Sequence, residues 1–138
     1  SALVYARYAA RPVAACAANC PVCDLPFHAT ERPDLPRTLY AAFADDPLGM
    51  EDALRARSPL HLAPELPRVP YFVAYGGADR AVDPRAHALP FCRAMREAGH
   101  ACQCLGVPAM AHCDLAAVPD ALNAYRAFVC RHAGGRTA

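Results

Sequence analysis

The chain has 138 residues, of which 55% are hydrophobic, so it can fold as one domain or as part of one. Its formal net charge of +1 at pH 7 gives no electrostatic reason to expect binding to nucleic acid or to an anionic membrane surface. No stretch approaches the roughly 18 consecutive apolar residues of a transmembrane helix, so no membrane span is expected.

The hydrophobic pattern of the first half predicts helices and one buried strand around a proline-rich stretch. In chain order we expect a helix at 2–10, a strand at 13–19 and a long loop at 21–36. Two short helices at 37–44 and 48–57 and an irregular segment at 58–70 follow. Asp46 is a possible N-cap of the second short helix.

The second half has a clearer pattern, in which strands and helices alternate. We expect a strand at 71–75, a helix at 84–99, a strand at 101–107, a loop at 108–114 and a helix at 119–132. This alternation predicts the α/β class, with a parallel sheet covered by helices on both faces. The proline-rich residues from about 25 to 57 then form a cap-like insertion.

Asp79 and His112 are the candidate catalytic residues. Asp79 follows the strand at 71–75 after a Gly-Gly-Ala sequence, and His112 follows the next strand after Met-Ala. The carboxyl ends of neighbouring parallel strands meet at one edge of a sheet, and such strands lie about 4.8 Å apart. The carboxylate can therefore accept one imidazole N–H, which leaves the other ring nitrogen free to act as a base.

Simpler interpretations exist for each of these residues. An Asp after Gly-Gly-Ala often only forms a turn with its own backbone, and a His in a Pro/Ala loop is often merely exposed. Asp83 and Asp114 are alternative acids, although Asp83 directly precedes Pro84 and is more typical of a helix cap. The remaining histidines show no consistent partner pattern, and His100 is expected to be exposed; they are His28, His61, His87, His100 and His132.

Three segments together resemble the α/β-hydrolase superfamily, especially its prolyl-oligopeptidase-like and acetyl-esterase-like branches. They are Ser58-Pro59-Leu60, the Gly-x-x-Asp-x-x-Val sequence that contains Asp79, and the loop that contains His112. Residues 2–12 and 20–25 resemble, more weakly, the helix behind the nucleophile and the segment after the next strand. The resemblance implies that residues 1–138 are the C-terminal part of one α/β-hydrolase domain.

The same resemblance implies a serine hydrolase that acts on a carboxylic ester or a peptide bond, with an ester favoured. Asp79 would be the acid of its catalytic triad and His112 the base. The family's Gly-x-Ser-x-Gly turn does not occur in the 138 residues, whose serines are Ser1 and Ser58. Ser58 matches a non-catalytic position, and Ser1 lies at the start of the helix that should follow the turn. We expect the nucleophile roughly three residues before Ser1, so the chain as given is expected to lack acyl-transfer activity.

Two further expectations follow from the incomplete domain. The insertion is expected to shape the substrate pocket. Five of its residues could line that pocket, although packing in a hydrophobic core would explain them equally well: Phe27, Leu39, Tyr40, Phe43 and Met50. An uncovered sheet edge is expected to favour self-association. The alternative function is a non-catalytic interaction domain with a hydrolase-like fold.

The eight cysteines are expected to be reduced, which favours a cytoplasmic protein. Five of them lie in apolar periodic segments, as buried free thiols often do: Cys16, Cys92, Cys102, Cys104 and Cys130. Cys20 and Cys23 form a C-x-x-C sequence, which leaves a thiol-redox function as an alternative. A zinc site that adds Cys102 and Cys104 is a poorer fit to the usual ligand spacing. No metal or organic cofactor is expected.

Overall fold

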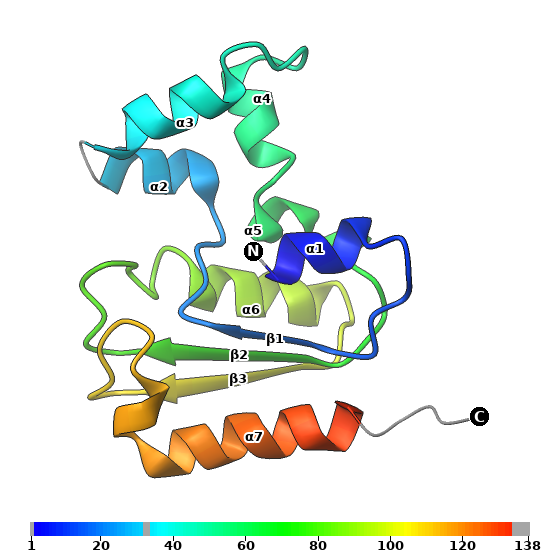
Figure 1. Cartoon of the computed structure of the whole chain (residues 1–138), viewed down its shortest axis with the longest axis vertical. Coiled ribbons are helices and arrows are strands. Elements are labelled where there is room, and N and C mark those ends of the chain that lie inside the picture. Colours follow the sequence, from blue (N-terminus) through cyan, green and yellow to red (C-terminus); the bar gives the residue numbers. More distant parts are fainter. Residues whose placement is uncertain (1, 32–33, 134–138) are drawn as a thin grey trace.

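A three-stranded parallel sheet forms the centre of the computed structural model, which describes residues 2–31 and 34–133 (Figure 1). The strands lie side by side in the order β1 (Cys16–Asn19), β2 (Tyr71–Gly76) and β3 (Cys102–Val107). Tyr71 is in register with Cys16 on one side and with Cys102 on the other, so β2 is paired along both edges. The predicted α/β class and parallel sheet are therefore confirmed.

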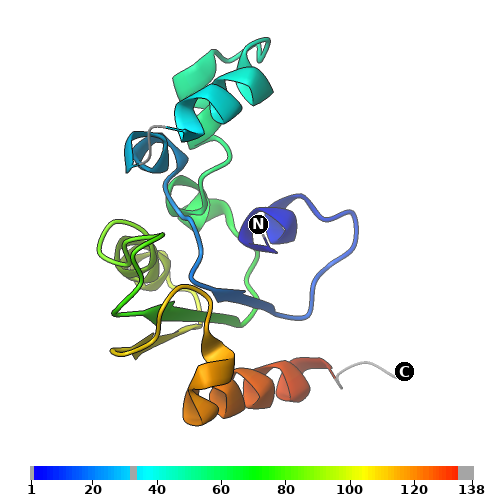
Figure 2. The same ribbon diagram turned by 60° about the vertical axis from the view of Figure 1, so that its left-hand side comes forward.

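Helices cover both faces of this sheet (Figures 1 and 2). Helices α1 (Ala2–Tyr8), α5 (Pro59–Leu62) and α6 (Ala88–Glu97) lie on one face, and α7 (Pro119–Ala133) lies on the other. Two short 3-10 helices, η1 (Ala63–Glu65) and η2 (Leu115–Ala117), precede β2 and α7 respectively.

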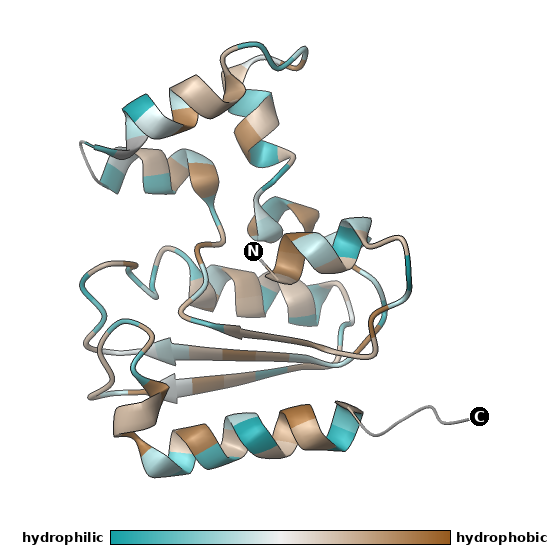
Figure 3. Ribbon diagram, in the orientation of Figure 1, coloured by the Kyte–Doolittle hydropathy of each residue, from teal (hydrophilic) through white to brown (hydrophobic). Residues whose placement is uncertain are grey.

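Successive residues of β2 enter the two cores in turn. Tyr71 and Val73 pack in the core under α6, whereas Phe72 and Ala74 pack in the core over α7. All four are at most 1% exposed, and Figure 3 shows the hydrophobic colouring along β2 and β3. A strand buried on both faces has no polar side, which explains why its sequence is continuously apolar instead of alternating.

Three helices from the proline-rich region form a separate layer, seen at the top of Figure 1. They are α2 (Leu25–Glu31), α3 (Leu35–Phe43) and α4 (Met50–Arg55), and they pack against one another. The prediction of a long loop over 21–36 is wrong where α2 forms. Asp24 starts this helix by accepting the N–H of Phe27, and Pro26 lies in the first turn, where a missing N–H is tolerated.

Other element boundaries differ from the prediction for local reasons. Asp46 does not cap α4; its carboxylate accepts the N–H of Leu48 and pairs with Arg57 at 2.8 Å. The segment 58–70 is helical in part, at α5 and η1. The helix predicted over 84–99 begins only at Ala88.

One pair of cysteines is oxidised, contrary to the expectation of reduced thiols. Cys92 and Cys104 form a disulfide between α6 and β3, across a Cα–Cα distance of 6.4 Å that is within the usual range. Cys92 lies on the buried side of α6, and Cys104 lies on the side of β3 that packs against it. Each position fits a buried apolar residue, so the hydrophobic pattern alone could not reveal the pairing.

His100 is also buried, at 7% exposure, although it was expected to be exposed. The chain turns at Gly99, whose φ of +76° favours glycine, and His100 then packs edge-on against the ring of Tyr71. Its Nε2 donates a hydrogen bond to the carbonyl of Ala63 at 2.8 Å. None of the helices in the described part of the chain has both the length and the apolar character needed to span a bilayer.

Candidate active site

The side chains of Asp79 and His112 meet at the carboxyl ends of β2 and β3. Asp79 Oδ2 accepts a hydrogen bond from His112 Nδ1 at 2.8 Å, across 33 residues of sequence. The Asp79 side chain is 2% exposed, whereas the His112 side chain is 41% exposed. The carboxylate is therefore fixed inside the protein, and the imidazole that it orients reaches the surface.

Backbone hydrogen bonds hold the two loops together. The N–H of Gly77 donates to the carbonyl of Val107 at 2.9 Å, and the N–H of Ala78 donates to the carbonyl of Met110 at 3.2 Å. A Cβ atom added to Gly76 would collide with the Met110 carbonyl. The Gly-Gly pair therefore allows the acid loop to approach the histidine loop closely, in addition to ending the strand as predicted.

The pKa of Asp79 is lowered from its ordinary value. Burial on its own would raise this pKa, but it is outweighed by hydrogen bonds from the N–H of Val82, from His112 and from the N–H of Ala81. The two backbone donors reach Oδ1 at 2.9 and 2.8 Å, which leaves Oδ2 for the imidazole. Asp79 is thus an anion at neutral pH, positioned to stabilise a positive charge on His112.

The stability of the chain should therefore depend on pH through Asp79. A carboxyl whose folded-state pKa is depressed stabilises the fold above its ordinary pKa, here 3.8, and this contribution disappears as the pH falls through the folded-state pKa. We expect the wild-type chain to be more stable than Asp79→Asn at about pH 6, and this difference to be smaller at a pH below 3.8. Urea unfolding at both pH values measures this; an equal difference at both would show that the ionised form is not what stabilises the fold.

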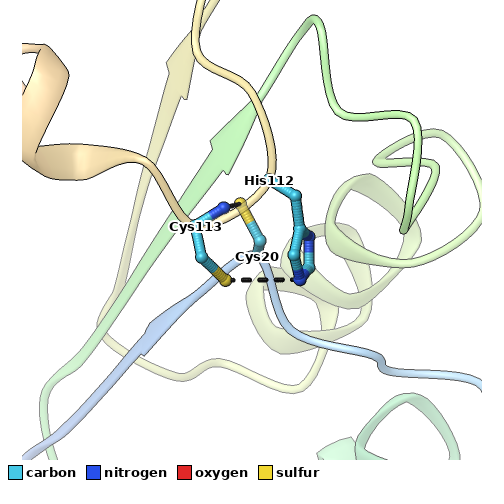
Figure 4. Close-up of side chains that lie close together, drawn as sticks. All are labelled: Cys20, His112 and Cys113. Carbon is cyan, nitrogen blue, oxygen red and sulfur yellow. Dashed lines mark hydrogen bonds between the residues drawn. The ribbon is translucent and has the colours of Figure 1, made fainter.

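Two cysteines surround the free side of the imidazole (Figure 4). Cys113 Sγ lies 3.5 Å from His112 Nε2, and Cys20 Sγ accepts the N–H of Cys113 at 3.2 Å. Burial raises the pKa of the Cys20 thiol to about 11, so it is protonated at neutral pH. Both cysteines have positive φ, 46° at Cys20 and 58° at Cys113, which is uncommon outside glycine. Cys113 follows His112 directly in the sequence, but the sequence pattern gave no reason to place Cys20 beside them.

The two rival acids have other roles. Asp83 forms a two-oxygen pair with the guanidinium of Arg85 and accepts the N–H of Arg85, and these contacts lower its pKa. Asp114 lies at the start of η2. The carboxylate that contacts His112 is that of Asp79.

Ser58 is fully buried and has a structural role. Its Oγ accepts the N–H of Leu25 at 2.9 Å and donates to the carbonyl of Leu54 at 2.8 Å, which joins the two ends of the three-helix layer. Ser1, the other serine, lies outside the described residues. The prediction that Ser58 is not a nucleophile agrees with these contacts.

Replacing Ser58 with alanine should therefore destabilise the fold. The substitution leaves the N–H of Leu25 without its acceptor and removes one of two donors to the Leu54 carbonyl, the other being the N–H of Arg57. We therefore expect the free energy of unfolding to fall by about 1–3 kcal/mol. Thr30→Ala is a matched control, because the Thr30 hydroxyl also bonds one backbone carbonyl but lies in an exposed position. If chemical denaturation gave equal midpoints for both variants, the joining role of Ser58 would be wrong.

His28 and His87 share a partner that the sequence did not reveal. Glu31 Oε2 lies 2.7 Å from His87 Nε2 and 2.8 Å from His28 Nδ1. Burial would raise the pKa of Glu31, but the two histidines outweigh it and lower the pKa. His87 is fully buried and precedes α6, whereas Glu31 ends α2, so this cluster anchors the three-helix layer to the body of the protein.

An open cavity of about 840 Å³ lies beside the acid loop. Its lining includes Asp79 and Arg80 from that loop, Leu89 from α6 and Glu31 from α2. The three-helix layer therefore contributes to the wall through the anchoring residue Glu31. The expectation for the pocket lining is wrong for this cavity, whose walls include none of Phe27, Leu39, Tyr40, Phe43 and Met50. Phe27 packs edge-on against His87, Phe43 lies against the guanidinium of Arg57, and Tyr40 is 52% exposed.

The C-x-x-C cysteines are separated by the sheet. Cys20 belongs to the core over α7, whereas Cys23 belongs to the core under α6 together with Cys104. Cys104 is also committed to its disulfide with Cys92. The four cysteines considered for a zinc site, Cys20, Cys23, Cys102 and Cys104, therefore do not converge.

The fold matches parts of several solved hydrolases. An acylaminoacyl peptidase from Pyrococcus horikoshii superposes with a TM-score of 0.69 at 15% identity, over 91% of this chain and 21% of the peptidase. A puromycin hydrolase gives 0.62 at 22% identity, over 79% of this chain and 16% of the other. An esterase from Thermogutta terrifontis gives 0.59 at 22% identity, over 92% of this chain and 45% of the esterase.

The chain spans less than half the length of each of these proteins. No family model matches the sequence, and no curated protein matches it significantly. The likeness is therefore one of fold, and all three structures belong to the α/β-hydrolase superfamily. Together with the parallel sheet and its two helical layers, it shows that this chain has part of the α/β-hydrolase fold.

Proposed function

We propose that the chain supplies the acid and the base of a serine-hydrolase active site that cleaves a carboxylic ester or a peptide bond. The observation that carries the proposal is the 2.8 Å hydrogen bond between the buried carboxylate of Asp79 and the exposed imidazole of His112. In this proposal residues 1–138 form the C-terminal part of one α/β-hydrolase domain. The nucleophile lies in a segment that precedes them.

The geometry supports a defined sequence of proton transfers. Because Asp79 accepts the Nδ1 proton, the neutral imidazole carries a lone pair on Nε2. Nε2 takes the proton of the attacking hydroxyl, and the adjacent carboxylate stabilises the imidazolium that forms. His112 then returns the proton to the leaving alkoxide or amine. In the second half of the reaction, Nε2 activates a water molecule that releases the acyl group.

The cavity beside Asp79 is the proposed substrate region, and the helices α2, α3 and α4 are the proposed cap. Peptide and ester substrates are both consistent with the solved structures of similar fold, one of which is an acylaminoacyl peptidase in complex with Z-Gly-Gly-Phe-chloromethyl ketone. Self-association of the chain through the free edge of β1 is also part of the proposal.

The test joins the chain to the sequence encoded upstream of it and assays hydrolysis of p-nitrophenyl acetate. We expect turnover, and labelling of a serine in the upstream part by a fluorophosphonate. The alternative, a non-catalytic interaction domain, predicts neither turnover nor labelling in a protein that is folded by circular dichroism. That result would refute the hydrolase proposal.

A further inference from the structure

Three metal-binding side chains converge at the proposed base. The donor atoms of Cys20, His112 and Cys113 all lie within 4.8 Å of one another (Figure 4). Cys20 follows the end of β1, and the other two residues belong to the loop after β3, so the fold brings them together from 93 residues apart. We propose that these residues bind one Zn²⁺ ion through two thiolates and one imidazole, at the nitrogen that the hydrolase reaction requires.

The imidazole is already oriented as a metal ligand. Histidines that bind metals usually donate their second ring N–H to a carboxylate or a carbonyl, which fixes the tautomer and the ring plane. His112 makes this contact, because its Nδ1 donates to Asp79 at 2.8 Å. Nε2 is therefore the ring nitrogen left free by Asp79, and it lies 3.5 Å from Cys113 Sγ.

The separation of the Cys113 and His112 donor atoms fits tetrahedral coordination. With Zn–S near 2.3 Å and Zn–N near 2.05 Å, a sulfur and a nitrogen on one tetrahedral ion lie about 3.6 Å apart. The separation of Cys113 Sγ and His112 Nε2 is 3.5 Å. Cys20 Sγ is held nearby by the N–H of Cys113, a contact that also stabilises a thiolate. Cys113 and His112 are exposed, so a solvent molecule can complete the fourth position.

Two other clusters of possible ligands are less suited to a metal. His87 Nδ1 accepts the N–H groups of Cys23 and Asp24, so the ring proton is on Nε2 and is donated to Glu31 instead of leaving a lone pair for an ion. In the second cluster, two of the three cysteines are joined by the disulfide between Cys92 and Cys104. The site at His112 has neither obstacle.

Binding of Zn²⁺ would displace the two thiol protons and occupy His112 Nε2. The metal site itself does not depend on the proposed hydrolase function, since it requires only the three side chains. Its consequence does: if His112 is the base, a bound ion prevents Nε2 from taking a proton, and Zn²⁺ is an inhibitor. The site would thus make hydrolysis sensitive to a thiol-seeking metal.

The experiment measures metal binding by the full chain without any hydrolysis assay. The chain is exchanged without a reductant and under anaerobic conditions into metal-free buffer, so that the Cys92–Cys104 disulfide stays closed. It is then titrated with Co²⁺, whose thiolate complexes absorb in the near ultraviolet, and afterwards with Zn²⁺. We expect one equivalent bound at this site, with cobalt–thiolate absorption that Zn²⁺ abolishes. Cys113→Ser, Cys20→Ser and His112→Ala should each lose that equivalent, and Asp79→Asn should bind about 10- to 100-fold more weakly.

Cys102→Ser is the matched control, because it removes a thiol from the other cysteine cluster and leaves the three proposed ligands intact. We expect it to retain the equivalent that Cys113→Ser loses. Circular dichroism of each variant checks that loss of binding is not loss of folding. The proposal is overturned if the wild-type chain binds no metal, or if binding disappears in Cys102→Ser and persists in Cys113→Ser. Inhibition of the joined protein by Zn²⁺ is a separate measurement, and it alone bears on the hydrolase role.

Discussion

Replacing His112 with alanine is expected to lower kcat by about 10⁴-fold or more, in the protein that carries this chain together with an upstream nucleophile. In the proposed mechanism the imidazole, which Asp79 orients, carries the proton from the attacking hydroxyl to the leaving group. Its loss leaves only binding and oxyanion stabilisation. The measurement is steady-state hydrolysis of p-nitrophenyl acetate, with kcat and KM determined separately.

Asp79→Asn should have an effect of similar size, about 10⁴-fold, for a different reason. An amide cannot stabilise the imidazolium, and it can donate to Nδ1, which would place the ring proton on Nε2 and remove the acceptor. The ¹⁵N chemical shifts of His112 in the chain alone report this change of tautomer. KM should change little, because neither residue is proposed to bind the substrate in its ground state.

Asp83→Asn and Asp114→Asn are the matched controls, since these carboxylates were the rival acids and do not contact His112. Both should leave kcat close to that of the parent protein. If Asp83→Asn or Asp114→Asn caused the large loss and Asp79→Asn did not, the acid would be misassigned. Near-full turnover in His112→Ala would refute the assignment of His112 as the base.

The parts of the fold that the sequence predicted well are those that depend on local pattern. The strand at Tyr71 to Gly76 is continuously apolar and ends in Gly-Gly, so neither its existence nor its limits required knowledge of distant residues. The contact between Asp79 and His112 was predictable for a related reason. Once two consecutive strands are parallel neighbours, the loops that follow them are forced to the same edge.

The features that the sequence did not reveal are contacts between residues that lie far apart in the chain. These residues also resemble the residues next to them in the sequence, so the local pattern does not distinguish them. Cys20, Cys23 and Cys92 are equally compatible with an apolar core, yet one lies beside His112, one lies on the other face of the sheet and one is oxidised. Likewise, Glu31 and His87 look like ordinary polar residues until α2 lies over the start of α6. Only packing distinguishes these roles.

Gly76→Ala should damage stability and catalysis together, because it tests the close approach of the two loops directly. An added Cβ would overlap the Met110 carbonyl and would also lie 2.9 Å from its carbon atom and 3.0 Å from the carbonyl oxygen of Ala111. These are backbone atoms of the loop that carries His112, and the carbonyl of Met110 is bonded to the N–H of Ala78. The clash cannot be relieved by a side-chain rotation, so the loop itself has to move.

We expect the free energy of unfolding of Gly76→Ala to fall by about 1–3 kcal/mol, as for other overpacked sites. A displacement of His112 by about 1 Å would also lower kcat roughly 100-fold in the joined protein. Gly106→Ala is the matched control on the neighbouring strand, where the three atoms nearest to the added Cβ all belong to the side chain of Tyr75, with its hydroxyl 2.8 Å away. That ring is partly exposed and can swing aside, so this variant should retain most of its stability and turnover.

Comparing the two variants thus distinguishes the effect of a clash with a side chain from the effect of a displaced backbone. In Gly76→Ala the ¹⁵N shifts of His112 should lose the preference for a proton on Nδ1, because the moved loop carries the imidazole away from Asp79; in Gly106→Ala they should not change. Equal stability and equal imidazole shifts in both variants would mean that the loops tolerate a wider separation than the structure has. The glycine would then serve only to end β2, and the fixed geometry of the acid and the base would have to arise from the hydrogen bonds around Asp79 alone.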